Sequence, residues 1–185
     1  MTKVADGLGL KDKIKYQGQA IDIKQLWPRV TVREAFSGAA GWDPLAVNDS
    51  LRFDTDFVTK VLPAFSRTRP TVLIDYPAWA ASLARLKPGN PLAAERAEVF
   101  IGGLELANAY SELTDAEEQE KRFREAIEKI EKERGQSMPV PDKFLKALSR
   151  LPRCGGVALG VDRLVMLFCD TAMIDDVMAF TVDEA

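Results

Sequence analysis

The sequence predicts one α+β domain in which helices of unequal length flank a single β-sheet. Residues 71–76 are rich in β-branched and aromatic side chains and predict a strand, and residues 95–109 are expected to be a second strand region. Apolar residues recur at helical spacing over 57–65 and 114–134. Strands interspersed with unequal helices are typical of the α+β class. A chain of 185 residues, 46% hydrophobic and 29% charged, is long and apolar enough for one globular core.

The chain divides into a mixed lead-in segment, residues 1–30, and a main domain over 31–185. Thr31 followed by Glu34 is a capping-box pattern, in which each side chain bonds the other residue's backbone N–H. This pattern marks the start of the main domain and predicts a short helix through about Ala40.

The middle of the chain alternates between helix and strand signals. A second helix is expected to begin at Asp54 or Thr55. The strand over 71–76 (TVLIDY) ends at Pro77, which cannot donate to a sheet ladder, and 78–90 is expected to be a loop.

The second strand region, 95–109, contains the pair Gly102-Gly103. Paired glycines inside a strand predict a β-bulge or a close approach by a ligand. The clearest helix follows at 114–134, where residues of opposite charge stand four positions apart on the polar face and can form ion pairs. A short helix is expected over 143–151.

Composition excludes several kinds of chemistry. The chain has no histidine, so a histidine base, a catalytic triad or a histidine zinc site is excluded. The net charge of −3 gives no overall basic surface for RNA. We find no membrane-spanning run and no signal peptide, and therefore expect a cytoplasmic protein without a membrane partner. Cys154 and Cys169 are expected to be reduced thiols in the core.

Three carboxylates, Glu98, Glu105 and Glu112, recur every seven residues. An odd separation places Glu98 and Glu105 on opposite faces of one strand, but a bulge at Gly102-Gly103 would return them to the same face. Two carboxylates near a phosphate-binding arginine suit Mg²⁺, which also takes phosphate oxygens and water. The alternative is that these are surface acids of an amphipathic strand.

The stretch CGGVALGVDRLVMLF, residues 154–168, is a glycine-rich strand that runs directly into an apolar helix. Arg163 is predicted in the first turn of that helix, where free N–H groups and the helix dipole favour anions. An arginine fork there suits a polyphosphate. The stretch closely resembles motif 3, the ATP-binding strand and helix of class II aminoacyl-tRNA synthetases.

The preceding block, EVFIGGLELANAYSEL, is similar to that of the lysyl-tRNA synthetases. This resemblance implies an antiparallel sheet flanked by helices and the use of ATP and Mg²⁺. It assigns Glu98 and Glu105 to the metal and the ATP phosphates, Arg163 and Gly160 to ATP, and Asn108, Tyr110 and Glu112 to the lysine substrate.

Ala158 departs from the tRNA-charging pattern, which has glycine at this position. Alanine there resembles the elongation factor P–(R)-β-lysine ligases, paralogues of lysyl-tRNA synthetase that attach β-lysine to a lysine of elongation factor P. The resemblance therefore implies lysine or (R)-β-lysine as substrate and elongation factor P as acceptor, with tRNA unlikely. The methyl of Ala158 would discriminate between the two amino acids by shape.

Motif 1, a dimer-interface helix, and motif 2, which carries an arginine for the α-phosphate, are not found in residues 1–30. We therefore expect the C-terminal half of a ligase catalytic domain, with little activity alone, completed by a homodimer or by a partner chain that supplies both motifs. Two alternatives stay open: a fragment of a lysyl-tRNA synthetase, and a non-catalytic module that binds nucleotide or lysine.

Overall fold

A computed structural model of the chain describes residues 1–181; the last four residues of the expected 31–185 domain lie outside the described part. The helices are α1 (Thr2–Gly7), α2 (Val32–Ala40), α3 (Ser50–Asp56), the π-helix η1 (Phe57–Val61), α4 (Leu62–Ala64), α5 (Ala116–Arg134), α6 (Asp142–Leu148) and α7 (Val161–Cys169), with short 3₁₀ turns η2 (Ala78–Ala80) and η3 (Asp175–Val177). The strands are β1 (Lys13–Tyr16), β2 (Gln19–Asp22), β3 (Arg29–Thr31), β4 (Thr71–Pro77), β5 (Leu86–Lys87), β6 (Asn90–Ile101), β7 (Leu104–Ser111) and β8 (Gly155–Leu159).

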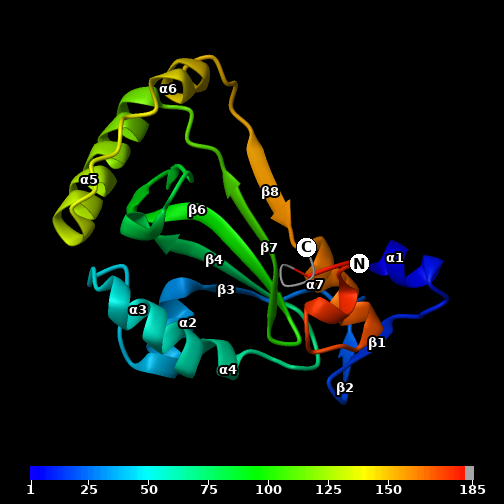
Figure 1. Cartoon of the computed structure of the whole chain (residues 1–185). Helices are drawn as coiled ribbons and strands as arrows, with labels where there is room; N and C mark the ends of the chain where they lie inside the picture. The colour runs from blue at the N-terminus through cyan, green and yellow to red at the C-terminus, as the bar shows by residue number, and fades with distance from the viewer. Residues whose placement is uncertain (182–185) are drawn as a thin grey trace.

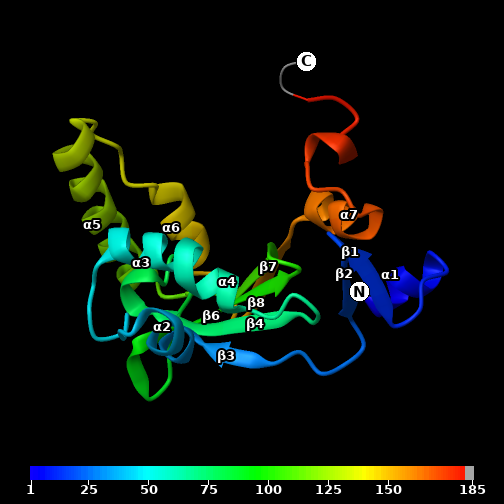
Figure 2. The same ribbon diagram turned by 90° about the horizontal axis from the view of Figure 1, so that it is seen from below.

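The predicted α+β class is confirmed. A six-stranded sheet has the order β3-β4-β6-β7-β8, with β5 paired to β6, and a separate hairpin joins β1 to β2. All pairs in the large sheet are antiparallel except β3 with β4, which is parallel. Helices α2 to α4 lie at the β3 side of the sheet, whereas α7 and the N-terminal hairpin lie at the end of the sheet where β6 turns into β7 (Figures 1 and 2). No helix among the described residues is long and apolar enough to cross a membrane.

The predicted capping box at the start of α2 is confirmed. The Thr31 hydroxyl accepts from the Glu34 N–H at 3.1 Å, and the Glu34 carboxylate accepts from the Thr31 N–H at 2.9 Å. Phe36 on the buried side of α2 stacks on Phe53 with ring centroids 4.5 Å apart. These rings form one core with residues of β4 and β6, namely Leu73, Tyr76 and Phe100. Helices α2 and α3 are thus anchored to one face of the sheet, which we call the front face.

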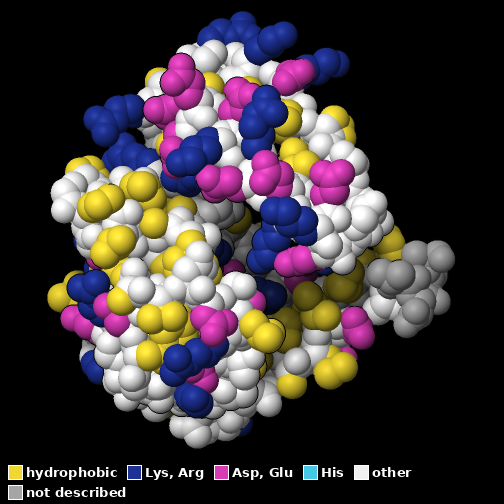
Figure 3. Space-filling view, turned by 90° about the vertical axis from the view of Figure 1, so that its left-hand side faces the viewer, with side chains coloured by type: hydrophobic (Ala, Val, Ile, Leu, Met, Phe, Trp, Pro, Cys, Tyr) yellow, Lys and Arg dark blue, Asp and Glu magenta, His cyan; other side chains and the backbone are white. Residues whose placement is uncertain are grey.

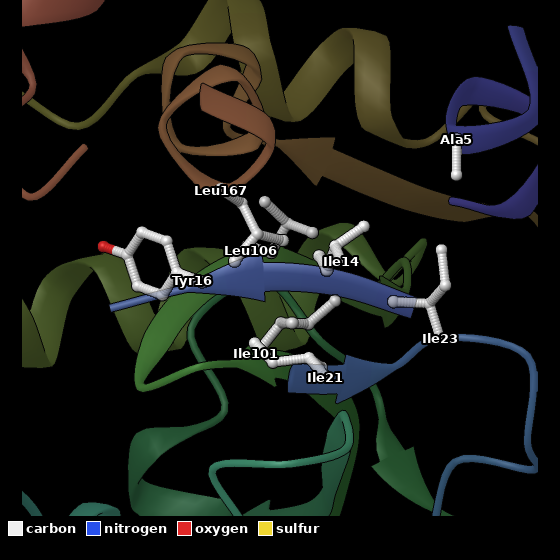
Figure 4. Close-up of a cluster of buried hydrophobic side chains, with 8 residues drawn as sticks. All are labelled: Ala5, Ile14, Tyr16, Ile21, Ile23, Ile101, Leu106 and Leu167. Atoms are coloured by element: carbon white, nitrogen blue, oxygen red, sulfur yellow. The ribbon is translucent and has the colours of Figure 1, made fainter. Parts of the chain in front are cut away.

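A second core joins the lead-in segment to the end of the chain. Its buried members come from α1, β1, β2 and the residue after β2, the β6–β7 hairpin and α7, and Figure 4 shows them: Ala5, Ile14, Tyr16, Ile21, Ile23, Ile101, Leu106 and Leu167. The hydroxyl-bearing ring of Tyr16 packs beside the hairpin turn, and the N–H of Gln17 donates to the Asp170 carboxylate at 2.6 Å. Residues 1–30 therefore pack directly against the motif-3-like helix.

The predicted β-bulge at Gly102-Gly103 is wrong. The two glycines, with φ of 61° and 92°, form a two-residue hairpin turn between β6 and β7. Both central residues of such a turn need positive φ, which glycine adopts without steric cost. The Arg67 guanidinium donates to the Gly102 carbonyl at 2.7 Å and fills the space that a side chain at Gly103 would need.

Other boundaries differ from those predicted. The second helix begins earlier than expected, because the Asp49 side chain caps α3 by accepting from the Arg52 N–H at 3.0 Å. The predicted loop at 78–90 contains η2 and β5. Cys154 and Cys169 are free thiols as expected, but both are exposed rather than in the core.

Asp56, a buried carboxylate at the end of α3, predicts a loss of stability in acid. It pairs with Lys60 at 2.5 Å and accepts from the Trp42 indole N–H at 2.8 Å. The hydrogen bond from Lys60, aided by that from Trp42, lowers the pKa of Asp56 against the opposing effect of burial. A folded-state pKa below the unfolded value stabilises the fold above the unfolded pKa, and this contribution disappears as pH falls through the folded pKa.

We expect urea unfolding at pH 7 and pH 3 to show a smaller acid destabilisation in Asp56→Asn than in the wild type. Asp54→Asn, an exposed acid of the same helix, should behave like the wild type. An acid response of Asp56→Asn equal to the wild type would contradict this prediction.

Candidate active site

Strand register places four of the predicted site residues, Glu98, Asn108, Tyr110 and Ala158, in two rows on the front face. Glu98 of β6 lies opposite Asn108 of β7, which lies opposite Ala158 of β8. The next row is Arg96, Tyr110 and Gly156. Cross-strand partners share one face of a sheet, so residues from three strands meet here although they are up to 62 positions apart in the chain.

Glu98 is a buried carboxylate with three hydrogen-bond donors. It accepts from the Tyr76 hydroxyl at 2.5 Å, the Arg96 guanidinium at 2.7 Å and the Asn108 amide at 3.0 Å. Burial raises the pKa of Glu98, the Glu105 carboxylate adds to that effect, and Tyr76 and Arg96 oppose it. Burial and the adjacent Glu98 also raise the pKa of Tyr76 well above its ordinary value, so this hydroxyl stays protonated and remains a donor.

Arg96 and Tyr76 belong to the site but were not predicted from the sequence. The Arg96 guanidinium donates to the Ala80 carbonyl at 2.9 Å and to the Asn108 side chain at 3.3 Å, and it lies 4.6 Å from the centre of the Tyr76 ring. Arg96 therefore ties β6, β7 and the segment after β4 together around Glu98. The period of two along a strand could have revealed Arg96, because it is two residues from Glu98 and points to the same face.

Glu105 and Arg163 meet at the hairpin end of the site. The Arg163 guanidinium donates to the Glu105 carbonyl at 2.9 Å and lies 3.7 Å from its carboxylate. As predicted, Arg163 is in the first turn of a helix, α7, whose N-cap is Gly160. The Gly160 N–H donates to the Leu106 carbonyl at 2.9 Å, which fixes the start of α7 against β7.

Glu98 and Glu105 are brought together differently from the prediction. They lie on neighbouring strands joined by the glycine turn, and one extra residue of β7 interrupts the register between Val99 and Phe100 of β6. The register places both side chains on the front face of adjacent strands, and the Glu105 carboxylate adds to the effect of burial in raising the pKa of Glu98.

The Glu112 side chain lies against Gly156 of β8. The backbone N–H of Glu112 donates to the Cys154 carbonyl at 3.0 Å, and a β-carbon on Gly156 would lie 2.3 Å from the Glu112 carboxylate oxygen. Gly156 thus leaves the space that the carboxylate occupies. Tyr110, in the same row, packs against a small buried cluster of Ala81, Ala84 and Ala94.

Helix α5 holds residues 82–84, a loop that pairs with Glu112 through Ala84. The Arg122 side chain donates to the Ser82 carbonyl at 3.1 Å and the Ala84 carbonyl at 2.8 Å. The side of the molecule that carries α5 shows Lys/Arg and Asp/Glu side chains intermingled rather than a region of one sign (Figure 3).

The donor set around Glu98 and Glu105 fits a magnesium ion that is shared with a ligand. Among residues 1–181, no group of three or more Asp, Glu, Cys or His side chains is arranged to hold a metal. A carboxylate offers about four lone-pair positions, of which three are used at Glu98. A cation between the two carboxylates would relieve the repulsion that helps to raise the pKa of Glu98. Two carboxylates alone are an incomplete Mg²⁺ shell, so the remaining positions would be filled by phosphate oxygens and water.

Comparison with known proteins agrees with this geometry. The family described as tRNA synthetases class II (D, K and N) matches residues 4–184, so the match also includes most of the lead-in segment. The elongation factor P–(R)-β-lysine ligases of Klebsiella pneumoniae, Salmonella paratyphi B and Salmonella heidelberg are each 45% identical over 130 residues. Those residues are 70% of this chain but 40% of each relative, so the match spans less than half the length of the relatives. The family match, covering nearly the whole described chain, shows that this protein belongs to the class II tRNA synthetases of the D, K and N group.

Proposed function

We propose that this chain is the sheet and motif-3 part of an ATP-dependent ligase that activates lysine or (R)-β-lysine and transfers it to a lysine of elongation factor P. The observation that carries the proposal is the alignment on one sheet face of a carboxylate pocket, formed by Glu112 over Gly156, with Arg163 at a helix start. The names of the relatives support the amino acid and the acceptor. Because the chain matches 40% of their length, the activity is proposed for the assembled ligase.

The phosphate end of the site consists of Arg163, Gly160 and the two glutamates. The guanidinium of Arg163, at the positive end of the α7 dipole, would bind the ATP polyphosphate by charge-assisted hydrogen bonds. Glu98 and Glu105 would hold Mg²⁺, which supplies neutralisation of phosphate charge. The Glu98 carboxylate is held in place by hydrogen bonds from Arg96, Tyr76 and Asn108. It would therefore not have to reorient when the metal and the phosphates bind.

The amino-acid end consists of Tyr110, Asn108 and Glu112. The Glu112 carboxylate would pair with a substrate ammonium, and the Tyr110 ring would cover the aliphatic stem. Held there, the substrate carboxylate attacks the α-phosphorus of ATP, the bond to pyrophosphate breaks, and an aminoacyl-adenylate forms. The acceptor lysine amine then attacks the acyl carbon and AMP leaves. Catalysis is thus mainly positioning and charge neutralisation.

A cytoplasmic location follows from this proposal, because the acceptor is a translation factor. We also propose that the activity needs a homodimer or a partner chain that supplies motifs 1 and 2.

Arg163 is expected to control ATP binding in the assembled ligase. Arg163→Ala should weaken Mg·ATP binding by about 1–3 kcal/mol, the value of a hydrogen bond to a charged group. Arg124→Ala, an exposed arginine on α5, should leave the affinity unchanged. Isothermal titration calorimetry measures how each substitution changes the ATP affinity. Repeating the titration with EDTA tests whether ATP binding needs magnesium, as the proposed site between the two glutamates requires. An ATP affinity unaffected by Arg163→Ala or by chelation would remove Arg163 and the glutamate pair from the site.

Ala158 tests the choice of substrate and thereby the proposed function. Ala158 lies opposite Asn108, and its methyl is the clearest difference from the tRNA-charging pattern. In the assembled ligase, Ala158→Gly should shift the ratio of adenylate formation toward α-lysine by about 10–200-fold, since one methyl is worth about 1–3 kcal/mol in such discrimination.

The measurement is pyrophosphate exchange with each lysine isomer, followed by transfer of labelled amino acid to elongation factor P or to tRNA. Ala109→Gly, which removes a methyl from the other face of the same sheet, is the matched control. The isolated chain should show little exchange. An unchanged isomer ratio would make Ala158 a packing residue, and transfer to tRNA alone would favour the lysyl-tRNA synthetase alternative.

A further inference from the structure

Arg96 is a half-buried side chain whose guanidinium contacts separate parts of the candidate site. Each nitrogen serves a different partner: Nη2 donates to the Glu98 carboxylate at 2.7 Å, Nε to the Asn108 side-chain oxygen at 3.3 Å and Nη1 to the Ala80 carbonyl at 2.9 Å. The guanidinium also lies 4.6 Å from the centre of the Tyr76 ring. Because a guanidinium is planar and its donors are fixed relative to one another, it cannot turn toward one partner without changing its bonds to the others.

Asn108 connects the metal end of the proposed site directly to the amino-acid end. Its side-chain oxygen accepts from Arg96, and its amino group donates to Glu98 at 3.0 Å. Only the oxygen of an amide can accept from a guanidinium, so Arg96 fixes which way the Asn108 amide points. The amide keeps a free hydrogen and a free lone pair for a substrate. A lysine bound to Asn108 would therefore act on a group that is already bonded to the glutamate proposed to hold magnesium.

The segment 78–84, between β4 and β5, forms a second connection from Arg96 to the amino-acid end. Arg96 holds the carbonyl of Ala80 in this segment. Farther along the same segment, Ala84 forms a β-bridge with Glu112. A displacement of the guanidinium would therefore be carried by a short stretch of backbone to the carboxylate proposed to bind the substrate ammonium.

The other arginines around the site contact one end only. Arg163 contacts Glu105 at the phosphate end. Arg122 of α5 holds the segment 78–84 through two of its carbonyls, and its ion pair is with an acid of its own helix. Within the described part of the chain, Arg96 is thus the arginine that bonds to groups of both ends.

Binding of Mg·ATP at Glu98 and binding of lysine at Asn108 and Glu112 would each restrict the same guanidinium. The first ligand to bind bears the cost of this restriction, and the second finds the guanidinium already fixed. Two ligands that share such a cost bind with positive cooperativity, and the effect of each on the other is equal by thermodynamic necessity.

We propose that Arg96 is a positioning residue that couples the two ends of the site, so that Mg·ATP and lysine each raise the affinity for the other. The identity of the two ligands rests on the proposed ligase function. The coupling itself rests on the contacts of Arg96 with Glu98, Asn108 and Ala80.

The test is isothermal titration calorimetry of lysine binding to the assembled ligase, without nucleotide and with saturating magnesium and an ATP analogue. A methylene group between the α- and β-phosphorus of the analogue prevents adenylate formation, so the titration reports binding alone. We expect the analogue to raise the lysine affinity at least about fivefold, the lower end of typical couplings. Arg96→Lys keeps a positive charge beside Glu98 but has no planar fork to hold Asn108 and Ala80 at once. In this variant both ligands should still bind, but the analogue should raise the lysine affinity less than about twofold.

Arg122→Lys is the matched control, because Arg122 holds the same segment 78–84 from α5. It should weaken lysine binding by the same factor with and without the analogue, which leaves the coupling unchanged. A merely structural role of Arg96 would have this same signature, since it would lower both lysine affinities and keep their ratio. Thermal unfolding verifies that both variants are folded.

Hydrogen exchange of the wild-type ligase provides a measurement that needs no variant. Magnesium and the analogue, without lysine, should slow the exchange of amides in the segment 78–84, while those of α6 should not change. A wild-type coupling below about twofold, a coupling that persists in Arg96→Lys, or a segment that does not respond to the analogue would each overturn the proposal. If neither ligand binds, the proposed function fails and the coupling with it, whereas binding of both ligands without coupling contradicts the coupling alone.

Discussion

Replacing Gly156 by alanine is expected to abolish tight lysine binding while leaving the fold intact. The new β-carbon would lie 2.3 Å from the Glu112 carboxylate oxygen, so one of the two groups would have to move. Since that oxygen ends a flexible side chain, Glu112 can swing away at little cost in stability. A substrate ammonium would then face no carboxylate, and losing one partner of a desolvated charge pair costs about 2–5 kcal/mol.

Calorimetry of lysine binding to the assembled ligase measures this loss, and thermal unfolding verifies the fold. Gly38→Ala is the matched control, because a β-carbon on this glycine of α2 meets nothing within 4 Å. If Gly156 acts through Glu112, the effects of Gly156→Ala and Glu112→Gln should not add in the double variant. Additive effects, or a lysine affinity unchanged in Gly156→Ala, would show that Glu112 does not depend on this glycine.

Ile21→Ala is expected to destabilise the whole domain by about 2–5 kcal/mol, the usual cost of emptying a buried isoleucine site. Ile21 is fully buried between the lead-in segment, the β6–β7 hairpin and α7. Its terminal methyl would lie 3.1 Å from a β-carbon on Gly102, so the contact with the turn is tight. The loss should therefore reach α7 and Arg163, which are distant from residue 21 in the chain.

Urea unfolding followed by fluorescence and circular dichroism tests this coupling. Leu26→Ala, in the same segment but 97% exposed, should change stability by less than about 0.5 kcal/mol. We expect one transition in all variants. A separate transition for residues 1–30, with the main domain unaffected by Ile21→Ala, would instead support the predicted boundary at residue 30 as a true division.

Features that depend on neighbouring residues were predicted correctly. The capping box of Thr31 and Glu34 needs only hydrogen bonds within one turn, and the helix predicted over 114–134 is observed as Ala116–Arg134 with Gly135 as its left-handed C-cap. Arg163 was placed in the first turn of a helix because the glycine-rich strand gives way to helical spacing there. Local propensity and periodicity are sufficient for such features.

Features that depend on distant residues were missed or misassigned. Paired glycines suit both a bulge and a tight turn, and the turn at Gly102-Gly103 was decided by strand pairing and by packing from Tyr16 and Arg67. The role of Tyr76 depends on a bulge at Asp75, whose φ is 58°, which shifts the register of β4 against β6. No pattern within the sequence around Tyr76 records that shift.

The sequence by itself determined the α+β class and the family resemblance, because these depend on short-range spacing and on motifs of neighbouring residues, and that resemblance named all of the candidate site residues except Tyr76 and Arg96. Only the tertiary structure decided how they are combined: Glu98 with Tyr76 and Arg96, Glu112 above Gly156, and the lead-in segment against α7. The physical reason is register. A shift of one residue between strands moves every side chain to the other face, and that alignment is set by the packing of segments far apart in the chain.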